Sequence, residues 1–239
     1  METNLPIYIG KDAIPNLLQY CENQHLSRFT LVADQNTYPV LGKAVEDAFK
    51  AHGLDVNTVI LSGQEIIADE HTIMQVLVRA SKEERVYLAI GSGTITDIVR
   101  FVSHRARTSF ISVPTAPSVD GFTSPSAPLV IARLKKTIPA QPPAAVFADL
   151  ATLSAAPHPL IAAGFGDMLG KYTSLAVWKL GHLLWDEPHS EHVAQRTRQA
   201  LQVCVDHAQG IGQASEEGIH GLMNGLLESG LCMLEFGNS

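Results

Sequence analysis

Glycine and small polar residues gather in residues 91–97, which read GSGTITD. The segment follows an apolar run at 86–90 and leads into a pattern of helical period. Backbone N–H groups at the start of a helix can bind an anion such as a phosphate group. Gly91 and Gly93 lack the side chains that would block its approach. The segment therefore predicts a site for the phosphates of a nucleotide.

A second segment, residues 112–125 (SVPTAPSVDGFTSP), closes another apolar run at 109–113. Its prolines and Gly121 make a loop that is too stiff for a simple linker. Ligands of open α/β sheets bind beyond the carboxyl ends of the strands, where both segments are expected to lie. The second segment therefore predicts a reaction site beside the nucleotide site.

Three aspartates are candidates for chemistry. Asp120, in the second segment, could position a substrate hydroxyl or the nicotinamide end of a cofactor, or be an ordinary turn residue. Asp167 enters a long apolar helical pattern, where a carboxylate needs a hydrogen bond, a cation or solvent. Asp167 could instead cap the helix or pair with Lys171, one turn further on. Asp34 could accept hydrogen bonds from a ribose, or form an Asx turn or helix cap.

The glycine pattern departs from the classical dinucleotide fingerprint. G-x-G-x-x-G needs a glycine where Thr96 stands, and no acidic residue follows about twenty positions later, because the next strand finishes in Pro114 and Thr115. The classical Rossmann interpretation is therefore weak. The alternative to a nucleotide site is a turn that starts a helix and binds nothing.

The ten histidines include no H-E-x-x-H and no Cys-His ligand spacing. His189 and His192 are expected to be solvated among acidic neighbours. His182 follows Asp167 by about four turns, which is too far for shared ligation along one straight helix.

Apolar runs and segments of helical period alternate along the first part of the chain. This alternation of continuous apolar strands with helices predicts a mostly parallel sheet covered on both faces. The expected strands are 6–9, 29–33, 56–61, 86–90 and 109–113, and the expected helices are 12–22, 40–52, 71–83 and 94–104.

A hairpin with arms 128–131 and 134–138 is expected next, and it carries Arg133, Lys135 and Lys136. These side chains either guard a solvated edge strand or contact a phosphate. From Pro157 onward the pattern becomes helical, over 160–185, 189–208 and 216–235. We expect an α/β domain over 1–155 and part of an all-helical domain over 156–239, with the chain stopping before that domain does.

Composition narrows the class of protein. The 239 residues carry a formal net charge of −7, so no basic surface is expected for nucleic acid or an anionic membrane. Cys21, Cys204 and Cys232 are widely separated, which fits a reducing cytoplasm. Neither an export signal nor an apolar span of about eighteen residues is present. The sequence predicts a soluble cytoplasmic protein.

The chain resembles the glycerol-1-phosphate dehydrogenases of the iron-containing alcohol dehydrogenase and dehydroquinate synthase-like superfamily. The most specific matches are residues 112–125, residues 164–180 (GFGDMLGKYTSLAVWKL) and the ending LLESGLCMLEFGNS from Leu226. The resemblance implies a dehydroquinate synthase-like fold with a metal-bearing cleft between an α/β nucleotide-binding domain and a helical domain. The implied reaction is the reversible NAD(P)H-dependent reduction of dihydroxyacetone phosphate to sn-glycerol 1-phosphate.

The resemblance also implies roles for individual residues. Asp120 and Asp167 would be catalytic and contact substrate, and Asp167 would also ligate a zinc or nickel ion. Ser92 departs from relatives with a third glycine, and serine is small enough to be tolerated there. The family's two histidine ligands are expected after a Gly-x-Ser like 237–239, where this chain ends. The implied NAD or NADP contacts are Gly93, Thr94, Ile95, Thr96, Asp97, Thr115, Ala116, Pro117, Ser118 and Ser124.

Several hypotheses remain open. The first is a metal- and NAD(P)-dependent, homo-oligomeric glycerol-1-phosphate dehydrogenase that supplies lipid or related synthesis. The second is a non-catalytic nucleotide-binding fragment or pseudoenzyme. Glycerol dehydrogenase and a dehydroquinate synthase-like cyclase are alternatives among enzymes. The loop that contains Asp120 favours the phosphate-bearing substrate.

Overall fold

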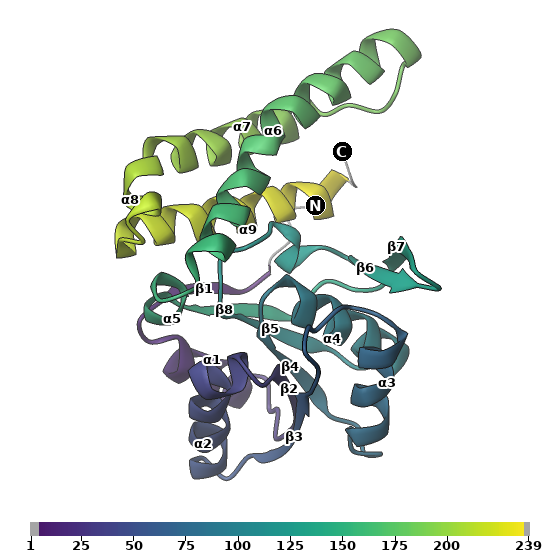
Figure 1. Cartoon of the computed structure of the whole chain (residues 1–239), viewed down its shortest axis with the longest axis vertical. Helices are drawn as coiled ribbons and strands as arrows, with labels where there is room; N and C mark the ends of the chain where they lie inside the picture. The colour runs from purple at the N-terminus through teal and green to yellow at the C-terminus, as the bar shows by residue number, and fades with distance from the viewer. Residues whose placement is uncertain (1–4, 237–239) are drawn as a thin grey trace.

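The computed structural model describes residues 5–236 of the chain, which form an α/β region beneath a layer of helices (Figure 1). A six-stranded parallel sheet has the strand order β1-β8-β5-β4-β2-β3. The fold confirms the predicted parallel α/β architecture followed by a helical region. The strands of the sheet are β1 (Ile7–Gly10), β2 (Arg28–Asp34), β3 (Asp55–Leu61), β4 (Val86–Gly91), β5 (Phe110–Pro114) and β8 (Ala145–Asp149).

Helices cover both faces of this sheet, as the continuous apolar strands predict. On one face, α1 (Ala13–Asn23) and α2 (Lys43–Ala51) bury Leu17 and Phe49 against β2, β4 and β5. On the other face, α3 (Glu70–Arg79) and α4 (Gly93–Arg105) bury Val76 and Ile98. The sheet thereby fixes where α4 begins, directly after the carboxyl end of β4.

Three details differ from the expected elements. Strand β8 was not predicted, because its five residues follow Pro142 and Pro143 without a preceding helix, yet it pairs with β1 and β5. The segment expected as one helix over 40–52 starts as a π-helical turn over Tyr38–Gly42 before α2. Helix α3 ends at Arg79 rather than at 83, since Ala80 is extended.

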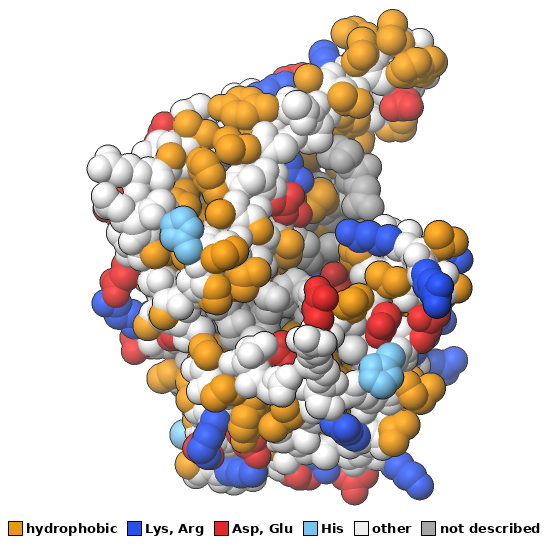
Figure 2. Space-filling model, viewed as in Figure 1, with side chains coloured by type: hydrophobic (Ala, Val, Ile, Leu, Met, Phe, Trp, Pro, Cys, Tyr) orange, Lys and Arg blue, Asp and Glu red, His pale blue; other side chains and the backbone are white. Residues whose placement is uncertain are grey.

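The helical region contains α5 (Leu150–Ser154), α6 (His158–Trp185), α7 (Glu191–Asp206), α8 (Ala208–Gly212) and α9 (Glu216–Phe236). These helices share a core with the inward side of β8, where Val146 and Ala148 are fully buried. The far end of α6 projects beyond its neighbours (Figure 1) and carries hydrophobic side chains on its surface (Figure 2). The division of the chain at 155 and 156 stays a prediction. No helix within residues 5–236 is long and apolar enough to span a membrane.

The predicted hairpin is present as β6 (Ser126–Ile131) and β7 (Leu134–Pro139). Val130 pairs with Asp69 just before α3, and the Ala132 backbone N–H donates to the Glu70 carboxylate at 2.7 Å. These contacts attach the hairpin to the α/β region beside α4.

Candidate functional site

A cleft of about 740 Å³ lies where the helical region meets the carboxyl ends of β4 and β5. Its walls come from the start of α4, the loop over residues 115–125 (the Asp120 loop), the hairpin, α6 and α9. The lining residues include Ser92, Gly93, Thr94, Asp97, Ser118, Asp120, Ser124, Lys135, Thr137, Asp167 and Met233. The two segments that the sequence singled out thus lie on one cleft.

Helix α4 presents its N-terminus to this cleft. Ser92 precedes the helix, and its side chain makes no capping hydrogen bond. The first N–H groups of a helix have no acceptor within the helix, so they can bind an anion here. A β-carbon at Gly93 would lie 2.8 Å from Cγ2 of Val119, which explains why glycine stands where α4 meets the Asp120 loop.

Two further glycines let helices contact the Asp120 loop. A β-carbon at Gly164 of α6 would collide with the backbone oxygen of Pro117. A β-carbon at Gly230 of α9 would collide with Thr123 and with the backbone oxygen of Asp120. The loop is therefore wedged between the α/β region and the helical region, with little freedom to move.

Asp120 is 8% exposed and is held by side chains from both long helices. Its Oδ2 atom lies 2.5 Å from Nζ of Lys171 on α6 and accepts a hydrogen bond from the Ser229 hydroxyl on α9 at 2.9 Å. These contacts fix the orientation of the carboxylate at the cleft wall. Sequence reasoning missed Ser229, which is 109 residues away from Asp120 along the chain.

Asp167 lies one helical turn before Lys171 on α6, and its Oδ2 accepts the backbone N–H of Asp120 at 2.9 Å. Burial, and then the neighbouring charge of Asp120, raise the pKa of Asp167. Asp167 lies inside α6, nine residues after its first residue, so it does not cap the helix. The ion pair of Lys171 goes to Asp120, which corrects the alternative that Lys171 pairs with Asp167.

Asp97 lines the cleft and contacts Arg100, a fully buried side chain of the same helix. Nη1 of Arg100 donates to Oδ1 of Asp97 at 2.5 Å. Burial raises the pKa of Asp97 to about 6, although the Arg100 charge opposes that shift. The spacing of Asp97 and Arg100 in an apolar helix was the available signal for this pair, and sequence reasoning missed it.

The residues proposed from the resemblance fall into two groups. Those that line the cleft are Gly93, Thr94, Asp97, Ser118, Asp120, Ser124 and Asp167. Those buried behind its wall are Ile95, Thr96, Thr115, Ala116 and Pro117. The structure brings both groups together, and their roles in binding remain predictions.

Side chains of the hairpin divide between its two faces. Lys135 and Thr137 line the cleft, and the alternation of a strand turns Lys136 to the opposite face. The fold therefore leaves a phosphate contact open for Lys135 and makes Lys136 an edge lysine. Arg133 lies in the turn, is exposed, and does not line the cleft.

Other candidates lie outside the cleft. The Asp34 carboxylate accepts the backbone N–H groups of Asn36 and Thr37 at 2.8 and 2.7 Å, which is the Asx-turn alternative. His192 is exposed, as expected. His189 is half-buried against Trp178 and His182, which corrects the expectation that it is solvated. Its ring packs there because the segment after α6 folds back along that helix.

Within residues 5–236, no group of three or more His, Cys, Asp or Glu side chains is arranged to hold a metal ion. Asp167 is one candidate ligand. Within residues 5–236 its carboxylate accepts one hydrogen bond, from the backbone N–H of Asp120. One carboxylate does not complete a zinc site, which usually needs three protein ligands or more. The expected Gly-x-Ser at 237–239 lies outside the described residues.

Comparison with known proteins gives consistent matches. Residues 8–157 match the family model of the iron-containing alcohol dehydrogenases. The chain is 46% identical over 236 residues to a glycerol-1-phosphate dehydrogenase, NAD(P)+, of Halalkalibacterium halodurans, covering 98% of this chain and 59% of that protein. A Pyrococcus furiosus protein of the same name is 31% identical, with 100% of this chain and 68% of that protein covered.

Solved structures show the same fold. The crystal structure of glycerol dehydrogenase from Schizosaccharomyces pombe aligns with a TM-score of 0.81 at 17% identity, covering 98% of this chain and 61% of that one. The chain thus spans about three fifths of the length of most of these relatives. Since the family model covers well over half of its residues, the chain belongs to the iron-containing alcohol dehydrogenase family.

Proposed function

We propose that this chain provides the nucleotide- and substrate-binding part of an NAD(P)-dependent glycerol-1-phosphate dehydrogenase. The reaction is the reversible reduction of dihydroxyacetone phosphate to sn-glycerol 1-phosphate, which supplies lipid or related synthesis. One observation carries the proposal: a single cleft joins the N-terminus of α4 to Asp120 and Asp167. The 46% identity to a protein of that name supports it.

In this proposal the dinucleotide lies along the start of α4. Gly93, Thr94 and Asp97 line its binding site, and Ser118 and Ser124 contribute from the Asp120 loop. Ile95, Thr96, Thr115, Ala116 and Pro117 shape the wall behind them. The nicotinamide supplies the hydride when the cofactor is bound.

Asp120 then orients the substrate. One of its oxygens, Oδ2, is occupied by Lys171 and Ser229, which leaves Oδ1 as the acceptor for a substrate hydroxyl. A fixed acceptor aligns the substrate carbonyl with the hydride donor without any movement of the loop. We further propose that Asp167 contacts substrate and is one ligand of a zinc or nickel ion, whose other ligands come from outside residues 5–236.

The surroundings of the protein are part of the same proposal. Cys21, Cys204 and Cys232 are buried and unpaired thiols, which suits a reducing cytoplasm. The projecting end of α6 leaves Leu183, Leu184 and Trp185 at least 60% exposed. An apolar surface of this kind is typical of an interface, so we propose a homo-oligomer, a dimer or larger.

The test is NADH and NADPH oxidation by the purified chain and by a form extended after Ser239 with the C-terminal portion of the Halalkalibacterium halodurans relative. Each protein is assayed with zinc, with nickel and with a chelator. Dihydroxyacetone phosphate is the substrate, and unphosphorylated dihydroxyacetone is the matched control. We expect metal-dependent turnover of the phosphorylated substrate by the extended form.

Other outcomes would identify the alternatives. Equal turnover of both substrates would favour a glycerol dehydrogenase. NADH binding without turnover by the extended form would favour a non-catalytic nucleotide-binding protein. A second candidate function is that the chain by itself binds nucleotide without catalysis. The observation that favours it is that residues 5–236 alone hold no complete metal site.

A further inference from the structure

Arg100 is the largest side chain that is fully buried in the described part of the molecule. Its guanidinium group makes four hydrogen bonds. Nη1 donates to Asp97 Oδ1 at 2.5 Å and to the backbone oxygen of Ser126 at 3.3 Å. Nη2 donates to the backbone oxygens of Gly121 and Phe122 at 2.6 and 3.0 Å. A single side chain thus joins α4 to the Asp120 loop and to the first residue of β6.

The partners of Arg100 lie on two different parts of the cleft wall. Asp97 lines the cleft beside the N-terminus of α4, where the dinucleotide is proposed to lie. Gly121 and Phe122 directly follow Asp120 in the chain. Arg100 therefore spans, from behind the cleft wall, the two parts of the site that must be correctly spaced for cofactor and substrate to meet.

Stability alone is a poor reason for this arrangement. Removing a guanidinium group from water is costly, and an apolar side chain of similar size often serves a core as well or better. In addition, Nε of Arg100 is buried without a hydrogen-bond partner within residues 5–236. What an apolar side chain could not provide is a planar fork that binds a carboxylate and backbone oxygens in fixed directions.

We propose that Arg100 is a positioning residue that sets the spacing between the nucleotide-binding start of α4 and the Asp120 loop. It acts through Asp97 on one side and through the backbone oxygens of Gly121 and Phe122 on the other. The proposal rests on the proposed function, since it assigns Arg100 to the dinucleotide site. Arg100 itself contacts neither cofactor nor substrate, because it is fully buried.

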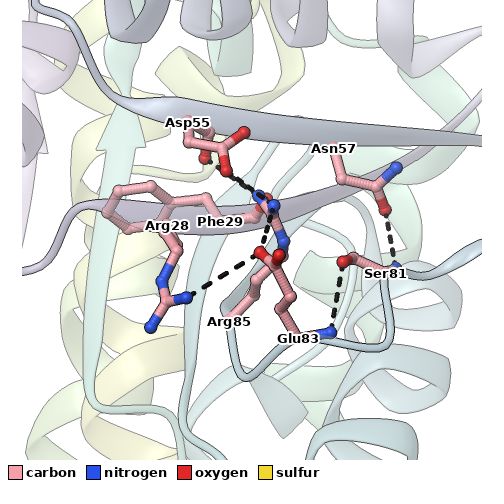
Figure 3. A network of polar contacts seen from close by, with 7 residues as sticks. All are labelled: Arg28, Phe29, Asp55, Asn57, Ser81, Glu83 and Arg85. Atoms are coloured by element: carbon pink, nitrogen blue, oxygen red, sulfur yellow. Dashed lines mark hydrogen bonds and ion pairs between the residues drawn. The ribbon is translucent and has the colours of Figure 1, made fainter.

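The chain offers a matched control in Arg85, whose side chain is 8% exposed (Figure 3). Arg85 donates to the Asp55 carboxylate at 2.6 Å, to the Glu83 carboxylate at 3.0 Å and to the backbone oxygen of Phe29 at 3.5 Å. These residues lie at or near the amino ends of β2, β3 and β4, at the opposite edge of the sheet from the cleft. Loss of Arg85 therefore removes a largely buried arginine network without touching the site.

The experiment compares Arg100→Lys and Arg100→Met with Arg85→Lys and Arg85→Met in the full chain. NADH affinity is measured by calorimetry, melting temperature by circular dichroism, and amide hydrogen exchange over residues 119–126 by mass spectrometry. We expect Arg100→Lys to weaken NADH binding by about tenfold, the scale of losing one hydrogen bond to a charged group. Exchange over 119–126 should also accelerate. The Arg85 variants should lower the melting temperature and leave both of the other readouts unchanged.

The results of this experiment distinguish a positioning role of Arg100 from a purely structural one. If Arg100→Met does not fold, Arg100→Lys carries the test, because it keeps the charge and loses the fork. Wild-type NADH affinity and exchange in a folded Arg100→Lys would overturn the positioning role, as would equal loosening of 119–126 in the Arg85 variants. If the wild-type chain binds no NADH, the proposed function fails. Exchange over 119–126 then still tells whether Arg100 holds the loop.

Discussion

The backbone N–H of Asp120 donates a hydrogen bond to the carboxylate of Asp167, with 2.9 Å between nitrogen and oxygen. The first residue belongs to the loop after β5 and the second to α6, so the bond crosses from the α/β region to the helical region. Asp120 and Asp167 are the two residues for which the sequence predicts catalysis. Their direct contact means that a change in the angle between the two regions would alter the site itself.

Replacing Asp120 should separate substrate chemistry from cofactor binding. In the extended form of the protein, Asp120→Ala and the isosteric Asp120→Asn should lower turnover at least about a hundredfold, the scale of losing a positioned group at a reaction site. NADH affinity should stay within about twofold, because the first turn of α4 is untouched. Steady-state kinetics and calorimetry measure the two effects. Normal turnover in Asp120→Asn would remove this residue from the site.

The contact between α6 and the Asp120 loop should tolerate no side chain at Gly164. Because a β-carbon there collides with the Pro117 backbone, Gly164→Ala should lower the free energy of unfolding by roughly 2 kcal/mol or more. Gly166, two residues later, has no atom within 4 Å of such a β-carbon and is the control. Gly166→Ala should raise the free energy of unfolding by up to about 1 kcal/mol, since alanine favours a helix. Urea denaturation of the two variants measures whether their changes in the free energy of unfolding have opposite signs.

Much of the fold could be predicted because continuous apolar runs identify buried parallel strands. The expected strands 29–33 and 86–90 lie within β2 and β4, and all of 109–113 except Ser109 lies within β5. This places both glycine- and proline-rich segments at one edge of the sheet. Strand β8 was not predicted, because its few residues carry no periodicity and their partners are set by the tertiary fold.

The side chains of the site also divide into those that the sequence could predict and those that it could not. The sequence located Asp120 and Asp167, since a carboxylate among small, stiff or apolar residues is conspicuous. Ser229 could not be found, because a serine in a helix has no local signal and its partner is 109 residues away. A pair of Lys171 with Asp167 was one alternative, and Lys171 pairs with Asp120 instead. Helical spacing could not indicate this, because Asp120 belongs to a loop that folds against the helix.

The two neighbouring lysines of the hairpin should differ in their effect on the cofactor. Lys135 lines the cleft among Asp97, Asp120 and Asp167, and it is the one lysine or arginine in the lining within the described range. Lys135→Gln should weaken NADH binding severalfold and reduce its dependence on salt, as expected for a phosphate contact. Lys136→Gln should have no effect on affinity. Equal affinities of the two variants would make Lys135 an ordinary edge residue.

The Asp97 carboxyl should give stability a distinctive dependence on pH. Its pKa is raised to about 6 in the folded protein, from 3.8, by burial. The folded state therefore binds the proton more tightly, and the associated stability is present below about pH 4 and lost as pH rises through about 6.

Asp97→Asn removes this titration, while the amide oxygen of asparagine can still accept a hydrogen bond from Arg100. The free energy of unfolding of the wild type, minus that of Asp97→Asn, should fall between about pH 4 and pH 6. Urea denaturation at several pH values measures this difference. A difference that is flat over that range, or that rises, would contradict the raised pKa of Asp97.

If the N-terminus of α4 binds the phosphates of NADH, as proposed, a negative charge at Thr94 should weaken that binding. Thr94 stands second in α4 and lines the cleft. A glutamate at this position favours the helix dipole, so Thr94→Glu should fold normally, but its charge should repel a phosphate. Glutamine has nearly the same shape as glutamate and no charge, so Thr94→Gln is the matched control.

The measurement is NADH affinity by calorimetry for the wild type and both variants, with melting temperatures as the check on folding. We predict that Thr94→Glu binds NADH at least about tenfold more weakly than Thr94→Gln, a difference of about 1.4 kcal/mol. Its melting temperature should match or exceed that of the wild type. Equal NADH affinity of the two folded variants would mean that the phosphates bind away from the N-terminus of α4.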